Sequence, residues 1–422
     1  MNNKAQHKSY DVIVIGAGAA GLIAAGRAAH LGASVLLVER MKRPGRKLLI
    51  TGKGRCNITN NEPLNVYYEN IFPGGRFLKH AFNGFFTNDI IKILHDNGVE
   101  TTTERGSRVF PVSDKSGDVL NAILKWMGKK NIDIIYNSRV SALLMEGTTV
   151  KGVRANTGSN TIDLFGGNVI ICTGGKSYPA TGSTGDGYEL ARQAGHTISD
   201  VRPALVPLVT KGDIAGKLQG LSLKNVKAVV WANGKKSSEE FGELMFTHYG
   251  LTGPIILTLS RHVVEKIYEG LKVEISIDLK PALDEKKLDA RLLRDLNSHG
   301  KKQVYNIFKL WLPSKLIPVF LELLKIDGQK LCNQVSAKER KKILLLMKSL
   351  KFVVSGHPGF EEAIITAGGV KTTEINSKTM ESKLVKSLYF AGEVIDLDGN
   401  TGGFNLQIAF STGWLAGEKC TF

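Results

Sequence analysis

The chain contains few cysteines and no long apolar run. Its four cysteines, Cys56, Cys172, Cys332 and Cys420, form no CxxC pair, which argues against a cysteine-ligated metal and against a dithiol redox couple. No apolar run approaches the ~18 residues that a membrane span needs, and the first nine residues are polar and basic, unlike a signal peptide. We therefore expect a cytoplasmic protein with reduced thiols, no metal site and no membrane segment. We expect Cys56 to pack, not to act as a reactive thiolate.

Acidic residues are scarce relative to basic ones. The chain has 56 Lys and Arg against 39 Asp and Glu, which gives a formal net charge of +17, and such a charge attracts phosphate-rich partners at long range. The densest basic clusters lie at 42–55 and 338–342. The first can serve a cofactor, and the helical pattern of the second is typical of a solvated face. We therefore do not expect a physiological nucleic-acid partner, and the oligomeric state stays open.

A glycine-rich turn near the amino terminus is the clearest functional motif. A short apolar run leads into Gly16, Gly18 and Gly21, and an alanine-rich helical pattern follows. In a dinucleotide site the first glycine permits a tight turn, the second admits a pyrophosphate, and the third lets the helix pack against the strand. A second apolar run ends at Glu39, where an acid can accept hydrogen bonds from a ribose. This end of the chain predicts a dinucleotide site, for either FAD or a nicotinamide.

A second glycine-rich segment, residues 44–60, contains too many turn formers to be one regular element. Its glycines allow a ligand to approach the backbone closely. The side chains of Arg46, Lys47, Lys53 and Arg55 can face a pyrophosphate or an anionic substrate. We expect this segment to be an ordered loop over the ligand.

The middle of the chain reads as a meander followed by a separate insert. The pattern predicts a helix from Ser116 to Met127, short antiparallel strands over 140–168 and a buried strand over 169–172 that ends in Thr173-Gly-Gly. Paired prolines near 202–207 mark a crossing into another unit. That unit combines a hairpin at Asn233-Gly234 and a strand at 272–278 with leucine-rich amphipathic helices.

The carboxy-terminal section returns to strand and glycine. An apolar strand delivers Gly392 and Glu393 at its tip, and Gly402-Gly403 opens a final amphipathic helix. A dinucleotide needs contacts at both of its ends, and here the two contact regions lie at opposite ends of the sequence, which favours FAD over a nicotinamide. The positive end of the final helix would stabilise the negative charge that a reduced flavin pyrimidine carries.

These motifs give the chain a clear family resemblance. It resembles the BaiN-like or YhiN-like bacterial flavoproteins, NAD(P)/FAD-dependent oxidoreductases that include an aminoacetone oxidase and a bile-acid reductase. The motifs that carry the resemblance are Gly16 to Gly21 with Glu39, Gly45 to Asn60, Thr173 to Gly187, Phe246 to Pro254, and Ala391 to Gln407.

The resemblance implies an α/β fold. A Rossmann-type, glutathione-reductase-like FAD-binding domain with a β-meander would be interrupted by a mixed α+β insert domain. The expected parts are 1–202, the first part of the FAD-binding domain; 203–352, the insert, with a β-rich part and a helical bundle; and 353–422, the second part of the FAD-binding domain. Glu393 stands where an Asp is usual at the ribityl contact.

The expected site combines both chain ends. The predicted cofactor-binding residues are Gly16, Gly18, Ala19, Ala20, Gly21, Glu39, Arg40, Arg46, Lys47, Gly54, Arg55, Val140, Thr173, Gly174, Gly175, Gly392, Glu393, Asp396, Gly402, Gly403, Asn405, Leu406 and Gln407. The catalytic candidates near the ring are Arg55, Lys176 and Tyr178, together with His248 and Tyr249 from the insert if it closes over the flavin. A histidine that titrates near neutrality is a natural proton carrier.

The leading hypothesis is a FAD-dependent oxidoreductase that transfers a hydride between a small or medium organic substrate and flavin N5. NAD(P)H and oxygen both remain possible redox partners, because the absence of a second glycine-rich loop argues only against a dedicated nicotinamide domain. The alternative, motivated by the positive charge, is a flavin-containing nucleic-acid-binding or RNA-modifying protein. A regulatory flavoprotein without turnover is a third reading, and the substrate stays open.

Overall fold

The computed structural model describes residues 9–128, 131–158 and 160–421. Of the first nine residues, which are polar and basic, only Ser9 belongs to the described part of the chain. By internal contacts the chain divides into two units. The first runs up to Pro203 and resumes at Ile364, and the second is Ala204–Ala363. Each unit is described by itself, and the division into domains at 202/203 and 352/353 stays a prediction.

The first unit is built on a seven-stranded sheet of order β7-β2-β1-β10-β9-β8, with β19 also paired to β10. The pairs among β7, β2, β1, β10 and β19 are parallel, and β10, β9 and β8 form an antiparallel meander. This is the Rossmann-type fold with a meander that was expected. The strands are β1 (Ser9–Ile15), β2 (Val35–Val38), β7 (Ile132–Ile135), β8 (Ser138–Glu146), β9 (Thr149–Thr157), β10 (Asn160–Ile171) and β19 (Leu388–Phe390).

One long strand, β10, belongs to both parts of this sheet. Its first half pairs antiparallel with β9 from Asn160 to Phe165, and its second half pairs parallel with β1 as far as Ile171. The expected break before Val169 is wrong, because the chain stays extended while its partner changes. The meander is thereby a continuation of the parallel sheet.

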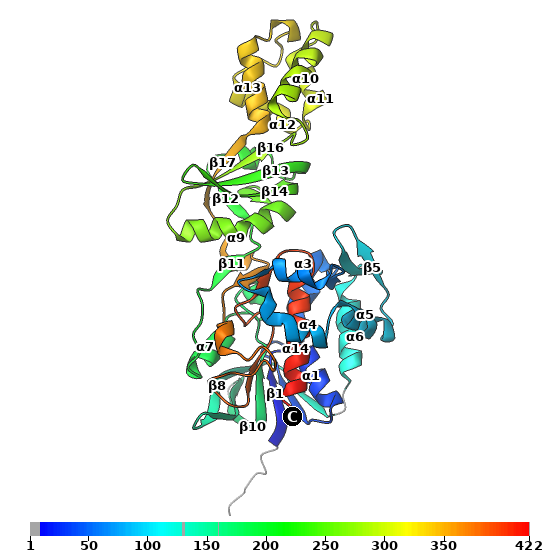
Figure 1. Ribbon diagram of the computed structural model, residues 1–422, viewed down its shortest axis with the longest axis vertical. Helices are drawn as coiled ribbons and strands as arrows, with labels where there is room; N and C mark the ends of the chain where they lie inside the picture. Colours follow the sequence, from blue (N-terminus) through cyan, green and yellow to red (C-terminus); the bar gives the residue numbers. More distant parts are fainter. Residues whose placement is uncertain (1–8, 129–130, 159, 422) are drawn as a thin grey trace, which may run out of the picture. The chain divides into compact units, whose positions relative to one another are not determined.

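Two helices lie against each other on one face of the sheet (Figure 1). They are α1 (Ala19–His30) and α14 (Phe404–Lys419). A Cβ on Gly413 would lie 2.3 Å from the carbonyl oxygen of Ala20, and one on Gly417 would lie 2.3 Å from that of Ala24. The two glycines are four residues apart and share a helix face, so they let the helix backbones touch. The last helix of the chain is thereby packed beside the first.

The remaining elements of the first unit surround this centre. The expected helix from Ser116 to Met127 is confirmed as α6. The other elements are α2 (Arg46–Ile50), η1 (Thr51–Gly54), β3 (Thr59–Asn60), α3 (Leu64–Glu69), β4 (Ile71–Phe72), η2 (Gly75–Leu78), α4 (Lys79–Gly84), α5 (Thr87–Asp96), β5 (Thr101–Glu104), β6 (Arg108–Pro111), η3 (Pro179–Thr181), α7 (Asp186–Gln193), β18 (Ile365–Ala367), η6 (Thr372–Glu374) and β20 (Asp398–Gly399).

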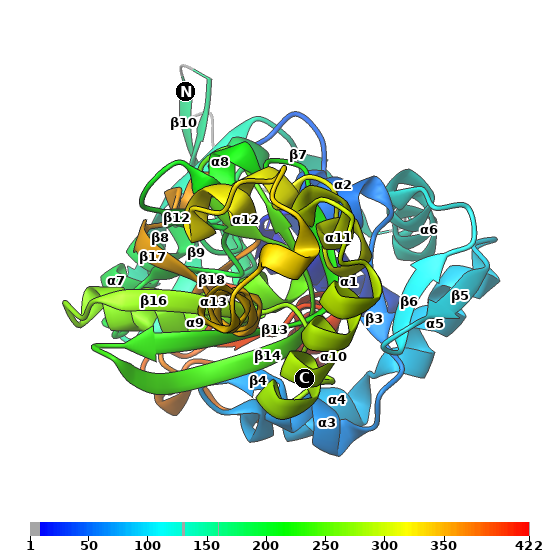
Figure 2. The same cartoon turned by 90° about the horizontal axis from the view of Figure 1, so that it is seen from above.

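The second unit contains a closed barrel of order β12-β15-β14-β13-β16-β17. Neighbouring strands β14, β13 and β16 run side by side (Figure 2). The expected hairpin is confirmed: Asn233 and Gly234 both have positive φ, as a type I′ turn requires. The strands are β12 (Leu208–Thr210), β13 (Ser222–Ala232), β14 (Lys235–Phe246), β15 (Gly250–Thr252), β16 (Val273–Asp278) and β17 (Leu350–Gly356).

Helices complete the second unit. The leucine-rich region forms four helices that share a hydrophobic core with the barrel. Strand β17 closes the barrel against β12 and β16, so this unit continues past residue 352. The helical elements are α8 (Ile214–Lys217), α9 (Pro254–Tyr268), α10 (Glu285–Ser298), α11 (Val304–Trp311), α12 (Leu316–Leu324), η4 (Cys332–Gln334), α13 (Ala337–Lys348) and η5 (Gly359–Glu361), and the short strand β11 (Arg202–Ala204) spans the first crossing.

Two absences hold for the part of the chain that the structure describes. None of its helices combines the length and apolar character needed to cross a bilayer. It also contains no group of three or more His, Cys, Asp and Glu side chains arranged to hold a metal ion.

Candidate functional site

A deep pocket in the first unit opens where β1, β2 and β10 end. The amino-terminal ends of α1 and α14 also reach it, so residues from both ends of the chain line one cavity. With the open space at its mouth, its volume is about 1320 Å³. In parallel α/β sheets, this edge is where ligands bind.

The glycine turn is shaped by backbone contacts. Gly16 has φ +98°, and a Cβ there would lie 2.7 Å from the carbonyl oxygen of Cys172. A Cβ on Gly21 would lie 1.9 Å from the oxygen of Gly16, so only glycine lets α1 begin this close to β1. Gly18 is different, because nothing lies within 4 Å of its Cβ position. The opening above Gly18 is a cradle that a pyrophosphate fits.

Glu39 lies at the end of β2 and is buried in the pocket wall. One carboxylate oxygen accepts the N–H of Ala17 at 2.7 Å, and the other accepts that of Met41 at 2.7 Å. Burial raises the pKa of Glu39, and these N–H groups oppose that effect. Each oxygen keeps a further lone pair. The side chain is thus held where it can accept ribose hydroxyls.

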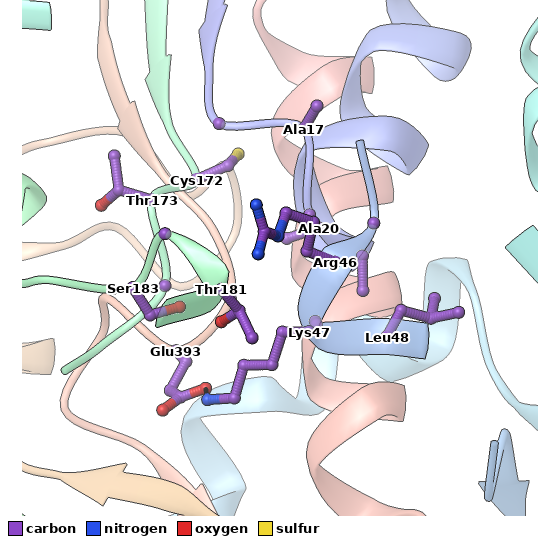
Figure 3. Close-up of a pocket in the computed structure, with 18 of the residues that line it drawn as sticks. Ala17, Ala20, Arg46, Lys47, Leu48, Cys172, Thr173, Thr181, Ser183 and Glu393 are labelled. Carbon is purple, nitrogen blue, oxygen red and sulfur yellow. Dashed lines mark hydrogen bonds and ion pairs between the residues drawn. The ribbon is translucent and has the colours of Figure 1, made fainter. Parts of the chain in front are cut away.

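The cationic side chains of Arg43 and Arg46 line the pocket near the start of α1. Figure 3 shows Arg46 reaching from α2 towards the strand end that carries Cys172 and Thr173. Within the described ranges, neither arginine makes an ion pair or a side-chain hydrogen bond. Helix α1 has no side-chain cap and no acid in its first turn. The charge of Arg46 also acts on the nearby Glu39 carboxylate. Positive charge beside a helix N-terminus is what a pyrophosphate requires.

Lys47 and Glu393 face each other across the pocket (Figure 3). The Lys47 ammonium donates to Glu393 at 2.6 Å and to the Ser177 hydroxyl at 2.6 Å. The other Glu393 oxygen accepts the Ser177 hydroxyl at 2.8 Å and the Thr366 N–H at 2.9 Å. Both Glu393 oxygens therefore already have protein donors. The carboxylate of Glu393 thus holds the Lys47 ammonium in place. Its contact with a ribityl chain stays a prediction.

The start of α14 is built around Gly403. This residue caps the helix with φ +101°, and a Cβ there would lie 2.3 Å from the carbonyl oxygen of Thr59. Asn405 and Leu406 then line the pocket. Gln407 points away, because its amide accepts from the Thr59 hydroxyl and donates to Ser411. The first turn of α14 has no acidic residue, so its N–H end stays electropositive.

Another charged cluster lies at the rim of the pocket. Asp186, at the start of α7, accepts hydrogen bonds from Arg40 at 3.0 Å and from Arg139 at 3.0 Å through each oxygen. Arg40 also donates to Thr184. Arg40 is therefore partly neutralised by Asp186, whereas Arg43 and Arg46 make no ion pair with the described residues.

Most of the predicted cofactor residues converge on the pocket. Those that line it are Gly16, Gly18, Ala19, Ala20, Glu39, Arg40, Arg46, Lys47, Val140, Thr173, Gly174, Gly392, Glu393, Asn405 and Leu406. Those that do not line it are Gly21, Gly54, Arg55, Gly175, Asp396, Gly402, Gly403 and Gln407. Several of the latter support the wall from behind, as Gly21 and Gly403 do. Their contacts with a cofactor stay predictions.

Sequence reasoning missed part of the lining. Arg43 lies in the basic cluster that was recognised, and its position before Gly45 was the available signal. The residues Thr181, Ser183, Ile364 and Ile365 also line the pocket. Thr181 and Ser183 lie inside the Thr173 to Gly187 motif, so that motif was the available signal for them. Ile364 and Ile365 lie where β18 begins, outside the motifs named above, and no sequence signal pointed to them.

Arg55 is engaged outside the pocket. Its guanidinium contacts Glu104 at 2.6 Å and Asp114 at 2.6 Å, and it lies over the ring of Phe110 at 4.2 Å. Hydrogen bonds to these carboxylates raise the pKa of Arg55. This arrangement fastens the loop, and a catalytic role for Arg55 stays a prediction.

The remaining catalytic candidates lie apart. Lys176 lines a second, polar pocket together with Arg139 and Asp186. Tyr178 adopts a left-handed backbone conformation just before η3. His248 and Tyr249 belong to the second unit, where their rings pack edge to face at 4.7 Å and the Tyr249 hydroxyl donates to Glu362. Their approach to a flavin stays a prediction.

The thiols have a packing role. All four cysteines are free and buried. Burial raises the pKa of Cys56 to about 12, so this thiol stays protonated at neutral pH and is a poor nucleophile.

The sheet, the glycine turn and a pocket built from both chain ends define a Rossmann-type FAD-binding flavoprotein. The chain belongs to the family described as HI0933-like protein Rossmann domain, which matches residues 10–419. It is 32% identical over 413 residues to a 3-dehydro-bile acid delta(4,6)-reductase of Clostridium scindens, covering 96% of this chain and 97% of that protein. It is 30% identical over 421 residues to a ribosomal RNA dihydrouridine synthase of Escherichia coli, covering 97% of each.

Solved structures show the same fold. A flavocytochrome c3 fumarate reductase superposes with a TM-score of 0.51 at 16% identity, covering 99% of this chain and 79% of that one. A 3-ketosteroid-delta4-(5alpha)-dehydrogenase from Rhodococcus jostii superposes with a TM-score of 0.50 at 14% identity, covering 100% and 98%. The chain is a FAD-dependent oxidoreductase, and its pocket fits that cofactor through the cradle at Gly18, the arginines Arg43 and Arg46, and the buried Glu39.

Proposed function

We propose that this protein is a flavin-dependent reductase of a carbon–carbon double bond conjugated to a carbonyl group. The names of two relatives support this chemistry, although their substrates differ. A 3-oxo compound with delta(4,6) double bonds is a conjugated dienone. Dihydrouridine is uridine whose ring double bond, conjugated to a carbonyl, has been saturated. The shared step is hydride addition to the far carbon of an enone.

The observation that carries the proposal is that residues from both ends of the chain line one and the same pocket. Gly18, Arg43, Arg46 and the start of α1 would hold the pyrophosphate, and Glu39 would hold the adenosine ribose. The start of α14 would face the pyrimidine edge of the flavin. When bound, FAD supplies a centre that accepts and donates a hydride.

Lys47 is the group on this chain best suited to assist such a reduction. Hydride addition to an enone moves negative charge onto the carbonyl oxygen, and a fixed cation lowers the cost of that charge. An ammonium has three N–H donors, and Glu393 and Ser177 use two of them. Among the described residues, no acceptor takes the third N–H. A proton then adds to the neighbouring carbon and completes the reduction.

Ribosomal RNA is a second candidate substrate. Two relatives, from Escherichia coli and Haemophilus influenzae, are ribosomal RNA dihydrouridine synthases at 30% and 32% identity. The formal net charge of +17 is favourable for a polyanionic substrate. The reaction would be the same, with a uracil ring in place of a small enone.

We place the protein in the cytoplasm, since all four thiols are free.

The test is a reoxidation experiment without oxygen. The FAD-loaded protein is first mixed anaerobically with NADH or NADPH, and bleaching of the flavin absorbance identifies the donor. The reduced protein is then mixed with a 3-oxo-Δ4 steroid, with a uridine-containing RNA or with buffer. We expect one of the two acceptors to restore the flavin colour faster than buffer does.

Two outcomes would overturn the proposal. If neither acceptor reoxidises the flavin while oxygen does so with release of hydrogen peroxide, the protein is an oxidase. If the purified protein is colourless and cannot be reconstituted with FAD, the assignment of the pocket fails.

A further inference from the structure

Positive charge is concentrated in the helical bundle of the second unit, here the segment from α10 to α13. From Glu285 to Lys348 the sequence has 15 Lys and Arg against 6 Asp and Glu, a net charge of +9. The whole chain has a net charge of +17, so this segment carries more than half of it. A charge imbalance this local is the electrostatic footprint of a polyanion partner.

Three of the six acidic side chains of the bundle are engaged within it. Asp289 pairs with Arg340 at 2.8 Å and joins α10 to α13. Glu339 pairs with Lys330 at 2.7 Å. Asp295 accepts the indole N–H of Trp311 at 2.9 Å and lies within ion-pair distance of two arginines. These acids fasten the helices together, so they do not neutralise the remaining lysines.

The uncompensated lysines lie on the surface, and three of them share one face of α13. Lys338, Lys341 and Lys342 are all exposed, and their spacing of three and four residues puts them on one side of the helix. Over the described ranges of the chain, none of the three lies within ion-pair distance of an acid. The same holds for exposed Lys286, Lys301, Lys302 and Lys325.

The opposite face of α13 is committed to the fold. Ile343, Leu344 and Met347 are buried in the core of the second unit. A helix binds a membrane surface by inserting its apolar face, and this face is not available. Lysines that extend from a rigid helix are suited instead to a phosphate backbone, which they contact as point charges.

We propose that the lysine face of α13 is an RNA-docking surface that contacts the phosphate backbone. This inference rests on the proposed function, in the form in which RNA carries the reducible uracil. The second unit then supplies sequence-independent affinity, and the pocket of the first unit supplies the chemistry. Docking through phosphates positions a substrate without reading its bases.

The experiment compares two triple variants of the FAD-loaded, full-length protein. The first is K338Q/K341Q/K342Q on α13, since Gln resembles Lys in helix propensity. The matched control is K125Q/K371Q/K378Q, which removes three exposed lysines of the first unit. The probe is a fluorescent, uridine-containing stem–loop RNA, and its affinity is measured over a series of salt concentrations.

We expect the α13 variant to bind the RNA roughly tenfold more weakly at low salt, with a slope of log affinity against log salt that is shallower by about 2. Each lost phosphate contact lowers that slope by ~0.7 for single strands and ~0.9 for duplexes. The control should keep the wild-type slope. Melting temperature and flavin content should match in all three proteins, which shows that the variants are folded.

Equal slopes for the two variants would overturn the docking surface. So would absence of RNA affinity at low salt, or binding of the α13 face to phosphatidylserine vesicles in preference to RNA. These failures are distinct from failure of the proposed function, because reoxidation by a 3-oxo-Δ4 steroid would still show the reductase activity.

Discussion

Replacing Glu39 by Gln tests the adenosine end of the pocket most directly. The two carboxylate oxygens accept the N–H groups of Ala17 and Met41. A Gln side chain has only one oxygen, so its amide group must face one of these donors. A buried N–H that loses its acceptor costs about 1–3 kcal/mol. We therefore expect E39Q to lower the free energy of unfolding by that amount even without FAD.

The effect on FAD affinity is separate. A hydrogen bond to a charged group contributes about 1.5–3 kcal/mol to the free energy of binding. The neutral amide of Gln would bind the ribose hydroxyls more weakly, because it lacks the negative charge of the carboxylate. The dissociation constant for FAD should therefore rise roughly ten- to a hundredfold. The assay is titration of the apoprotein with FAD, followed by flavin fluorescence. E39D keeps the negative charge and should lose less FAD affinity than E39Q. The control E69Q changes an exposed glutamate and should bind FAD like the wild type.

The pH dependence separates a ribose contact from mere loss of stability. Burial raises the pKa of Glu39 above its unfolded value. The folded apoprotein therefore binds this proton more tightly than the unfolded chain, and its stability falls as pH rises from the unfolded pKa through the folded one. FAD affinity should change in the opposite direction, since ribose hydroxyls donate to the ionised form. It rises through the folded pKa and then levels off, and this step should vanish in E39Q. An E39Q protein with wild-type affinity and an unchanged pH profile would refute the reasoning.

Two further predictions concern the glycine turn behind the pocket wall and Lys47 inside the pocket. G21A puts a Cβ 1.9 Å from the oxygen of Gly16 and should lower the free energy of unfolding by about 1–3 kcal/mol. The control G117A has open space around its Cβ position and should not lower it. Equal denaturant midpoints for the two variants would contradict this prediction. K47M should lower the flavin midpoint potential by roughly 20–40 mV, because removing ~1–2 kcal/mol of favourable charge interaction disfavours the reduced form of a two-electron couple. K47R should retain most of the wild-type potential, and an unchanged potential in K47M during spectroelectrochemical titration would exclude an effect of this charge on the flavin.

Local patterns in the sequence predicted much of the fold. The helix at Ser116–Met127 and the turn at Asn233-Gly234 follow from signals within a few residues, namely apolar periodicity and residues that tolerate positive φ. The break expected before Val169 was wrong, because the partner of β10 changes and its conformation does not. The register and the partners of a strand depend on tertiary structure, so a local sequence pattern does not predict them.

The same distinction applies to the site. Glu39 and the glycine turn were accessible from sequence because their spacing reflects one compact strand–helix–strand unit. The ion pairs of Arg55 could not be predicted from the sequence, since Glu104 and Asp114 are distant from it along the chain. The link between Lys47 and Glu393 joins the two chain ends. Residues 364 and 365 reach the pocket from the start of β18. Long-range partners of this kind decide whether a charge is free for a ligand or already neutralised.

A cavity lined by both chain ends has a consequence for biosynthesis. A ribosome makes Gly16 and Glu39 before the second unit, and Gly392 and α14 after it. Until then the face of α1 that Gly413 and Gly417 cover is exposed, and the nascent first unit has half a cofactor site while the second unit is being made. Domains generally fold as units during synthesis, and the whole of the second unit is made before the first is complete. Cofactor capture would then be one of the last events in maturation, and chains released before α14 would not retain FAD.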